Sequence, residues 1–407
     1  MAEVAMEQWE YDVLSCKIML SDETIDIEVD KVDNILIEAD FDNDYFPIFS
    51  VSIQMNDDVY NRMIKEKTSA KIRLKLSKHT IDETDNSTGT DQTVFNKLFT
   101  YVMDDDTPDL EDSSKEAVNT STVDSTDDMS ELNERTFFLY SYSDLKKSAI
   151  AINDIITKGN INTAVAYVLS KAGYDNLLFE KSSNAKTYSE ILIPPLTVQG
   201  ALLYLQEYYG IYKTGMTYFH GLDRIYVISQ SEKCNVFAKN EFKKTVINVL
   251  KSTTTSSLET GTYSDSDKKT YFVNALPQAI DVRNLSLVNN LTTGNVIVAT
   301  NPFTGKTTTV KPKSKQIDKG SKRFMTDKSL SGYTVSAEKF EVAENSYQIT
   351  LQTGKFDISA FTPNKAFQFI FEDKGINKIY GGNYRLISYA MNISDNIGTF
   401  IFRKKPA

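Results

Sequence analysis

The fold is decided by residues Ile191–Ser229, which read ILIPPLTVQGALLYLQEYYGIYKTGMTYFHGLDRIYVIS. Pro194 and Pro195 exclude a helix immediately before them. Thr197 is suited to cap a helix N-terminus, and Gly210 supplies a stop. Between these two residues, apolar side chains recur at helical spacing, at Val198, Ala201, Leu202, Leu205 and Tyr209. The pattern predicts a short amphipathic helix that ends at Gly210.

A β-hairpin is predicted directly after this helix. Two β-branched and aromatic runs, Met216–Phe219 and Arg224–Ile228, flank the four residues His220–Asp223. A four-residue loop that contains glycine is typical of a connection between antiparallel strands. This prediction places His220 in the hairpin loop. We interpret the helix and the hairpin together as a structural module rather than a catalytic one.

The first 100 residues alternate apolar and polar side chains with period two. Apolar alternation is seen in Ile25–Val29, Ile35–Ile37, Phe49–Ile53 and Ile72–Leu76. Such alternation predicts half-buried β-strands. Asp57–Lys67 departs from it and is predicted to be a short helix between two strands. We therefore expect a small β-barrel with one crossing helix, which closes near residue 145.

One segment carries the acidity of the whole chain. Asp104–Glu134 contains 12 acidic residues and only Lys115, a net charge of −11, whereas the chain of 407 residues has −10. Its polar composition predicts a surface loop inserted between Phe95–Met103 and Arg135–Tyr142, which should pair as a hairpin. It is interpreted either as a solvated insertion or as a charged surface that contacts a basic partner or repels nucleic acid.

Helical patterns replace the period-two alternation between residues 146 and 235. Helices are predicted at Leu145–Thr157 and at Asn162–Lys171, the second ended by Gly173. With the helix and hairpin described above, they indicate an α/β domain. After residue 235 the chain returns to short β runs, at Lys269–Asn274, Val296–Ala299 and Tyr347–Gln352.

A basic segment, residues 305–323, lies within this later β-rich region. Its basic residues surround a single Asp318 and are Lys306, Lys311, Lys313, Lys315, Lys319, Lys322 and Arg323. Aromatic residues occur only at its margins, at Phe303 and Phe324, so the stacking platforms of a single-strand binder are missing. We interpret it as an exposed loop or a protein-docking segment, and its charge is opposite to that of the acidic segment.

The C-terminal region is predicted to be a meander of three strands with turns marked by glycine. The segment begins with Gly354–Pro363, and the runs Phe367–Phe371, Gly381–Ser388 and Gly398–Lys404 follow. We therefore predict a mainly β, multidomain (α+β) protein divided into residues 1–145 with the acidic insertion 104–134, 146–235, 236–345 with the basic segment, and 346–407.

The composition limits the compartment and the cofactors. Cys16 and Cys234 are the only cysteines and lie far apart, so they predict buried free thiols rather than a disulfide framework. No apolar run approaches the roughly 20 residues of a membrane span. The acidic start MAEVAMEQWEYD lacks the basic and apolar regions of a signal peptide. We expect assembly in the cytoplasm and no membrane contact.

Catalytic motifs are sparse. His79 and His220 are the only histidines, and no HExxH motif or Cys/His cluster occurs. GxSxG, P-loop and GxGxxG motifs are also missing, whereas paired carboxylates among 55 acidic residues discriminate nothing. A Ser/His/Asp arrangement stays open from sequence. We predict a non-enzymatic protein with no catalytic, cofactor-binding or metal-binding residues and no cofactor.

The order of several features resembles the baseplate hub proteins of tailed bacteriophages. They are the double proline at Pro194, the helix end YLQEYYGIYKTG at Tyr204–Gly215, the hairpin YFHGLDRIYVIS at Tyr218–Ser229, and the segment Lys355–Lys404. The resemblance implies two tail-tube-like β-barrel domains that flank the α/β domain. The chain itself shows no internal repeat by eye.

The resemblance also implies a function. Three copies with two barrels each form a pseudo-sixfold ring, which joins the hexameric tail tube to the trimeric central spike. The expected partners are the chain itself as a homotrimer, the tail tube protein, the central spike protein and other baseplate proteins, with no direct nucleic-acid binding. The expected location is the virion, in the tail baseplate, after assembly in the host cytoplasm.

Two other functions stay open. A receptor-binding or adhesive tail protein should expose an aromatic-lined pocket or groove for a surface glycan, whereas a hub should bury its aromatics and expose strand edges. Trp9 is the only tryptophan, which disfavours a sugar site. The second alternative is a hub with cell-wall hydrolase activity.

Overall fold

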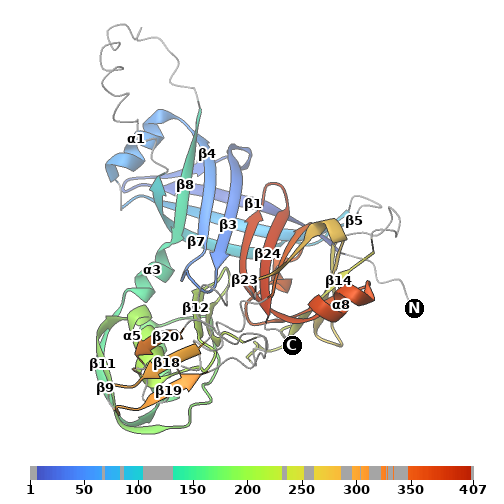
Figure 1. Cartoon of the computed structure of the whole chain (residues 1–407). Helices are drawn as coiled ribbons and strands as arrows, with labels where there is room; N and C mark the ends of the chain where they lie inside the picture. The colour runs from blue at the N-terminus through green and yellow to red at the C-terminus, as the bar shows by residue number, and fades with distance from the viewer. Residues whose placement is uncertain are drawn as a thin grey trace, which may run out of the picture.

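The structure, a computed structural model, is built mainly from β-strands (Figure 1). It describes residues 7–66, 69–82, 87–103, 132–231, 236–251, 261–285, 296–302, 304–310, 322–326, 328, 333 and 347–404. Most of the acidic insertion, the centre of the basic segment and Cys234 lie outside these residues. Among the described helices, none is both long and apolar enough to cross a membrane.

The N-terminal part of the chain forms an antiparallel sheet in the order β3-β4-β8-β7-β5-β1-β2. The strands are β1 Gln8–Met19, β2 Thr24–Ile27, β3 Val32–Asp40, β4 Ile48–Met55, β5 Lys71–Asp82, β7 Gln92–Met103 and β8 Asn133–Ser141. β7 pairs with β8, which confirms the predicted hairpin around the acidic insertion. Helix α1, Asp57–Glu66, lies between β4 and β5 as predicted.

The C-terminal part forms a second group of paired strands. They are β14 Lys244–Val249, β15 Gly261–Asp265, β16 Thr270–Ala275, β17 Ile280–Asn284, β21 Tyr347–Gly354, β22 Ala366–Phe371, β23 Gly382–Asn392 and β24 Ile397–Lys404. β22, β23 and β24 pair in sequence order, which confirms the predicted meander. Helix α8, Lys374–Tyr380, was not predicted; it begins where the Asp373 carboxylate accepts hydrogen bonds from two backbone N–H groups.

Strand β23 joins the two parts. One edge of β23 pairs with β24, and the other pairs first with β22 and then with β3, where Ser388 lies opposite Asp40. The blue N-terminal strands and the red C-terminal strands therefore lie side by side (Figure 1). Phe49 and Phe400 accordingly belong to one continuous hydrophobic core.

The predicted pair of closed barrels is not confirmed. Among the described residues, the large sheet is a single open sheet whose strand order runs from β15 to β2. Strands β24, β21 and β17 form a branch that joins it at β23. An isolated bridge between Glu7 and Thr262 adds one further link between its two ends. Period-two alternation predicts strands and their buried faces, but it does not determine which strands pair across hundreds of residues.

The middle of the chain forms a separate unit with its own hydrophobic core. Its elements are α3 Tyr142–Ser148, β9 Ala151–Asn160, α4 Ile161–Ala172, β10 Leu177–Phe179, β11 Thr187–Thr197, α5 Val198–Tyr204, a π-helical turn Leu205–Tyr209, β12 Met216–His220 and β13 Ile225–Ser229. The Thr197 hydroxyl accepts a hydrogen bond from the Gly200 N–H, and Gly210 ends the turn, so the predicted helix is confirmed. The hairpin of β12 and β13 is confirmed as well.

The predicted helix at Leu145–Thr157 is wrong. Helix α3 ends at Ser148, and β9 then begins at Ala151 and pairs with β11. The β-branched residues of this run suit a strand, and pairing with β11 satisfies their backbone groups. The predicted helix at Asn162–Lys171 is confirmed as α4.

A small sheet packs near the middle unit. It consists of β18 Val296–Thr300, β19 Thr307–Val310 and β20 Lys322–Thr326, and appears in orange beside α5 in Figure 1. Lys328 forms an ion pair with Glu207 of the π-helical turn, at 3.2 Å. Lys328, just after β20, therefore contacts the middle unit.

Candidate functional site: a charged pocket where four segments meet

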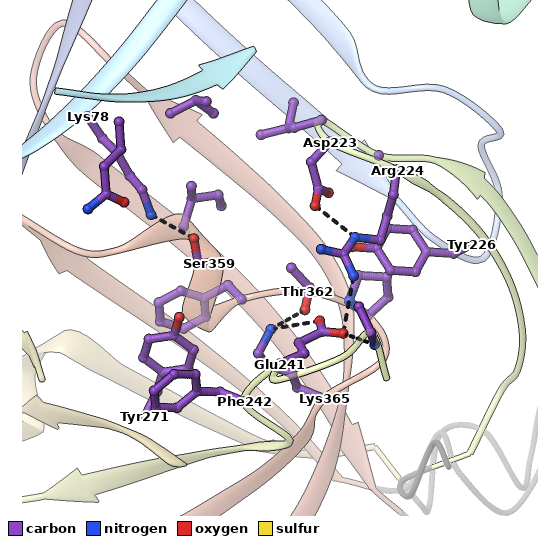
Figure 2. Close-up of a pocket in the computed structure, with 18 of the residues that line it drawn as sticks. Lys78, Asp223, Arg224, Tyr226, Glu241, Phe242, Tyr271, Ser359, Thr362 and Lys365 are labelled. Atoms are coloured by element: carbon purple, nitrogen blue, oxygen red, sulfur yellow. Dashed lines mark hydrogen bonds and ion pairs between the residues drawn. The ribbon is translucent and has the colours of Figure 1, made fainter. Parts of the chain in front are cut away.

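A pocket of about 400 Å³ lies where four separate segments of the chain meet (Figure 2). Its walls come from the strand pair of β5 with β7, the loop between β12 and β13, residues 238–242, and residues 358–365. Residues from both parts of the large sheet and from the middle unit thus face one another here. Pockets at such junctions are common binding sites, so we describe this pocket as the candidate site.

The hairpin loop reaches the pocket because of a tight turn at Gly221. The Gly221 N–H donates to the Arg224 carbonyl at 2.8 Å. A Cβ atom on Gly221 would lie 2.8 Å from the Tyr226 ring and 2.9 Å from that carbonyl oxygen. Only glycine fits this close approach, and the turn places Asp223 and Arg224 at the rim.

Glu241 is the centre of the charged network. Its carboxylate lies 3.1 Å from Arg224 and 3.6 Å from the Lys365 ammonium. It also accepts hydrogen bonds from the Ala238 N–H and from the Asn364 side chain. Burial alone would raise the pKa of Glu241, but Lys365 and these donors outweigh it and lower that pKa. Glu241 is therefore held as a carboxylate.

Lys365 is almost completely buried beside Glu241. Burial lowers the pKa of its ammonium to about 8, although Glu241 opposes that shift. The ammonium donates to the Thr362 hydroxyl at 2.6 Å. Its charge is therefore stabilised by a carboxylate and a hydroxyl of the same pocket, as Figure 2 shows.

A second buried ion pair lies on the opposite wall. Lys78 of β5 pairs with Asp357, and its ammonium also donates to the Ser359 hydroxyl at 2.6 Å. Asp357 caps the short turn Ile358–Ala360 by accepting from the Ser359 N–H. Because Lys78 belongs to the N-terminal sheet and Asp357 to the C-terminal part, this pair ties the two parts together.

Aromatic side chains complete the lining. Phe242 and Tyr271 pack with ring centroids 4.5 Å apart, and Figure 2 shows them together at one side. Tyr226, Tyr389 and Phe361 also line the pocket and are buried. The pocket can therefore accept a small polar or ring-shaped group against aromatic walls.

His220 lies behind the hairpin loop, and the prediction that it sits in the loop is wrong. It is the last residue of β12, its side chain is fully buried, and its backbone N–H donates to the Tyr45 carbonyl at 2.8 Å. Its Nε2 lies 2.7 Å from the Tyr218 hydroxyl. Its Nδ1 lies 3.8 Å from Asp144, which is too long for a hydrogen bond.

The titration of His220 and Asp144 reflects this burial. Burial lowers the pKa of His220, and the attraction of Asp144 only partly opposes that shift. Burial would raise the pKa of Asp144, but His220 and Lys97 outweigh it and hold that pKa well below its usual range. Lys97 donates to Asp144 and to the Gly221 carbonyl, both at 3.1 Å, and so connects this pair to the pocket loop.

We expect the protein to lose stability as the pH falls below about 6.5, the pKa of an unfolded histidine. The folded His220 has a lowered pKa, so the unfolded state binds its proton first. Above pH 6.5 both states carry neutral His220, and its contribution to the free energy of unfolding is complete. Between pH 6.5 and the lowered pKa of the folded state, this free energy falls by up to about 1.4 kcal/mol per pH unit. Urea unfolding at pH 7.5, 6.5 and 5.5 measures it. His220→Gln should flatten the slope; an unchanged slope in this variant would contradict the assignment.

Sequence reasoning identified some of these residues and missed others. Trp9 and Cys16 are buried, and the Lys78 ammonium lies 4.6 Å from the Trp9 ring. Cys16 is therefore a buried free thiol as predicted. Glu241 and Lys365 carried no signal in the sequence, because each is a single charged residue in a short connection. Of the pocket walls, the loop between β12 and β13 lies in an element that was predicted from the sequence, the hairpin.

Comparisons with known proteins give a family and a fold. A family model described as the Bacteriophage PBS1 gene 109 protein matches residues 1–398. The fold is similar to that of a tail protein from Neisseria meningitidis MC58, with a TM-score of 0.53 and 9% identity over 97% of both chains. It is also similar to the 43 kDa tail protein of prophage MuSo2 from Shewanella oneidensis, with a TM-score of 0.51 and 8% identity over 96% of this chain and 99% of that chain. No curated protein matches the sequence.

Proposed function

The chain belongs to the family of the Bacteriophage PBS1 gene 109 protein, and we propose on this basis that it is a structural component of a phage tail baseplate. Its fold is similar, over nearly the whole chain, to two proteins described as tail proteins. In the proposed role it is a homotrimeric hub with pseudo-sixfold symmetry. The hub joins the hexameric tail tube to the trimeric central spike and contacts other baseplate proteins.

The observation that carries this proposal is the pairing of two β-rich parts through β3 and β23. Each part contains a short helix between two strands, α1 between β4 and β5, and α8 between β22 and β23. Three copies of a chain with two such parts present six related β-rich parts around a threefold axis. We propose that each part is a tail-tube-like barrel unit of the ring, within domains divided near residues 145, 235 and 345.

The mass of the protein in solution tests the proposal. Light scattering of the full chain, alone and mixed with the tube and spike proteins, should give a particle of about three times 45.9 kDa before counting any bound partner. Ring-shaped particles should then be visible by electron microscopy. A chain that stays monomeric across the concentration series, with both neighbours present, would contradict the hub.

A receptor-binding or adhesive tail protein is the second candidate, and the aromatic lining of the pocket is the observation that favours it. In that case the purified chain should bind host cell-surface glycans, and Tyr271→Ala should weaken that binding at least tenfold. A hub requires no such binding. Glycan binding by a chain that stays monomeric would favour the adhesin.

We propose a non-enzymatic role in the virion, with assembly in the host cytoplasm and no direct contact with nucleic acid or membrane. The charged groups of the candidate pocket hold one another in ion pairs, as those of Glu241 with Arg224 and Lys365 show. Incubation with purified cell walls tests the remaining alternative. Release of soluble cell-wall fragments would make the protein a hub with hydrolase activity.

A further inference from the structure

Three side chains with oxygen or nitrogen ligand atoms, none of which lines the pocket, converge on the N-terminal sheet. Asp12 belongs to β1 and His79 to β5, and Asp91 directly precedes β7. β1 and β7 pair with opposite edges of β5, so His79 lies between the two carboxylates. The strand register, and not the sequence spacing, brings the three together.

The distances suit a single bound ion. His79 Nδ1 lies 2.9 Å from an Asp12 oxygen and 3.7 Å from an Asp91 oxygen, and the ligand atoms of all three residues lie within 4.8 Å of one another. Two ligand atoms that are each about 2.1 Å from one zinc ion lie roughly 3.0–3.4 Å apart at angles between 90° and tetrahedral. The two distances from His79 Nδ1 lie within a few tenths of an ångström of this range, and the two carboxylate oxygens, which are within 4.8 Å of each other, can approach because both side chains are about half exposed.

His79 provides an independent sign of a missing ligand. The residue is only 8% exposed, yet its buried Nδ1 has no hydrogen-bond partner among the described residues. The Asp12 carboxylate is near enough, but the two groups are not aligned for a hydrogen bond. A buried imidazole nitrogen without a partner is destabilising unless something binds it.

We propose that Asp12, His79 and Asp91 bind one divalent transition-metal ion, of which Zn²⁺ is the best fit. One imidazole nitrogen and two carboxylate oxygens form a donor set that zinc accepts. Both aspartates are about half exposed, so water can reach the fourth position. The ion links β1, β5 and β7 and stabilises that face of the sheet. The prediction from sequence of no metal residues is revised by this proposal.

Titration of the metal-free full chain with Zn²⁺ at pH 7.5, by calorimetry and by thermal unfolding, tests the site. We expect one ion per chain and a rise in Tm of roughly 4 °C at a hundredfold excess over Kd. His79→Gln and Asp91→Asn should each weaken binding at least tenfold. Because Asp91 is exposed, Asp91→Asn should fold even where the change at His79 does not.

Glu10 supplies the matched control. It lies opposite His79 in the strand register but is not a member of the cluster, so Glu10→Gln removes one negative charge next to the site without removing a ligand. This variant should bind Zn²⁺ within twofold of the unchanged protein. No zinc binding, or binding that Asp91→Asn and Glu10→Gln weaken equally, would overturn the proposal.

Discussion

Replacing Phe400 by alanine is expected to lower the free energy of unfolding by about 3–5 kcal/mol. Phe400 is completely buried in β24, and its ring stacks on Phe361 with centroids 3.8 Å apart. It also packs edge-on against Phe356 at 5.2 Å. Alanine would leave a cavity among aromatic rings that the strand pairings hold in place, so the site has little freedom to collapse.

Urea unfolding, followed by the fluorescence of Trp9, measures this change. The Trp9 backbone bonds to the Lys355 carbonyl, so its signal reports on the same region. Phe324→Ala is the matched control, because Phe324 is 74% exposed and its loss should change stability by less than about 0.5 kcal/mol. A loss below about 1 kcal/mol for Phe400→Ala would show that this core is not the common core of the two β-rich parts.

The sequence allowed local elements to be predicted far better than their assembly. The helix before Gly210, the hairpin after it and the pairing of β7 with β8 each depend on residues close in sequence, and all three are present. The pairing of β3 with β23 joins residues about 350 positions apart. No periodicity specifies such a partner. The predicted barrels, which came from the alternation and from the family resemblance, therefore did not include this pairing.

The errors in the middle unit have a different cause. Residues 145–157 have apolar spacing that fits a helix or a strand, and the partner β11 decides for the strand after Ser148. His220 was assigned to the loop because it follows the run Met216–Phe219, whereas β12 extends through His220, which pairs with Ile225 and whose buried Nε2 lies beside the Tyr218 hydroxyl. In both cases a tertiary contact outweighs the local preference.

The candidate sites were beyond sequence reasoning for a related reason. The pocket combines the hairpin loop with Glu241 and Lys365, and the proposed zinc ligands are Asp12, His79 and Asp91. Each is one charged or polar residue in an otherwise ordinary segment. These residues come together only through the strand register and the meeting of distant segments. Their number and spacing in the sequence therefore do not predict a site.

Replacing Lys78 by methionine is the second change with a large expected effect, a loss of about 3–5 kcal/mol in the free energy of unfolding. Methionine keeps most of the aliphatic stem but leaves Asp357 as an unpaired, buried carboxylate. An unpaired buried charge is more destabilising than the loss of the pair itself. The double variant Lys78→Met with Asp357→Asn should therefore be more stable than Lys78→Met alone.

An exposed ion pair in the same sheet gives the control for this prediction. Lys17 pairs with Asp26 across β1 and β2, with 39% and 72% of the two side chains exposed. Lys17→Met should therefore change stability by less than about 1 kcal/mol in the same urea experiment. If Lys78→Met changed the free energy of unfolding equally little, water would have to reach Asp357 in the folded protein, and the ion pair would not hold β5 against the turn Ile358–Ala360.

A large loss of stability that the double variant partly restores would instead show that this ion pair couples the two β-rich parts, because Lys78 and Asp357 belong to different parts of the sheet.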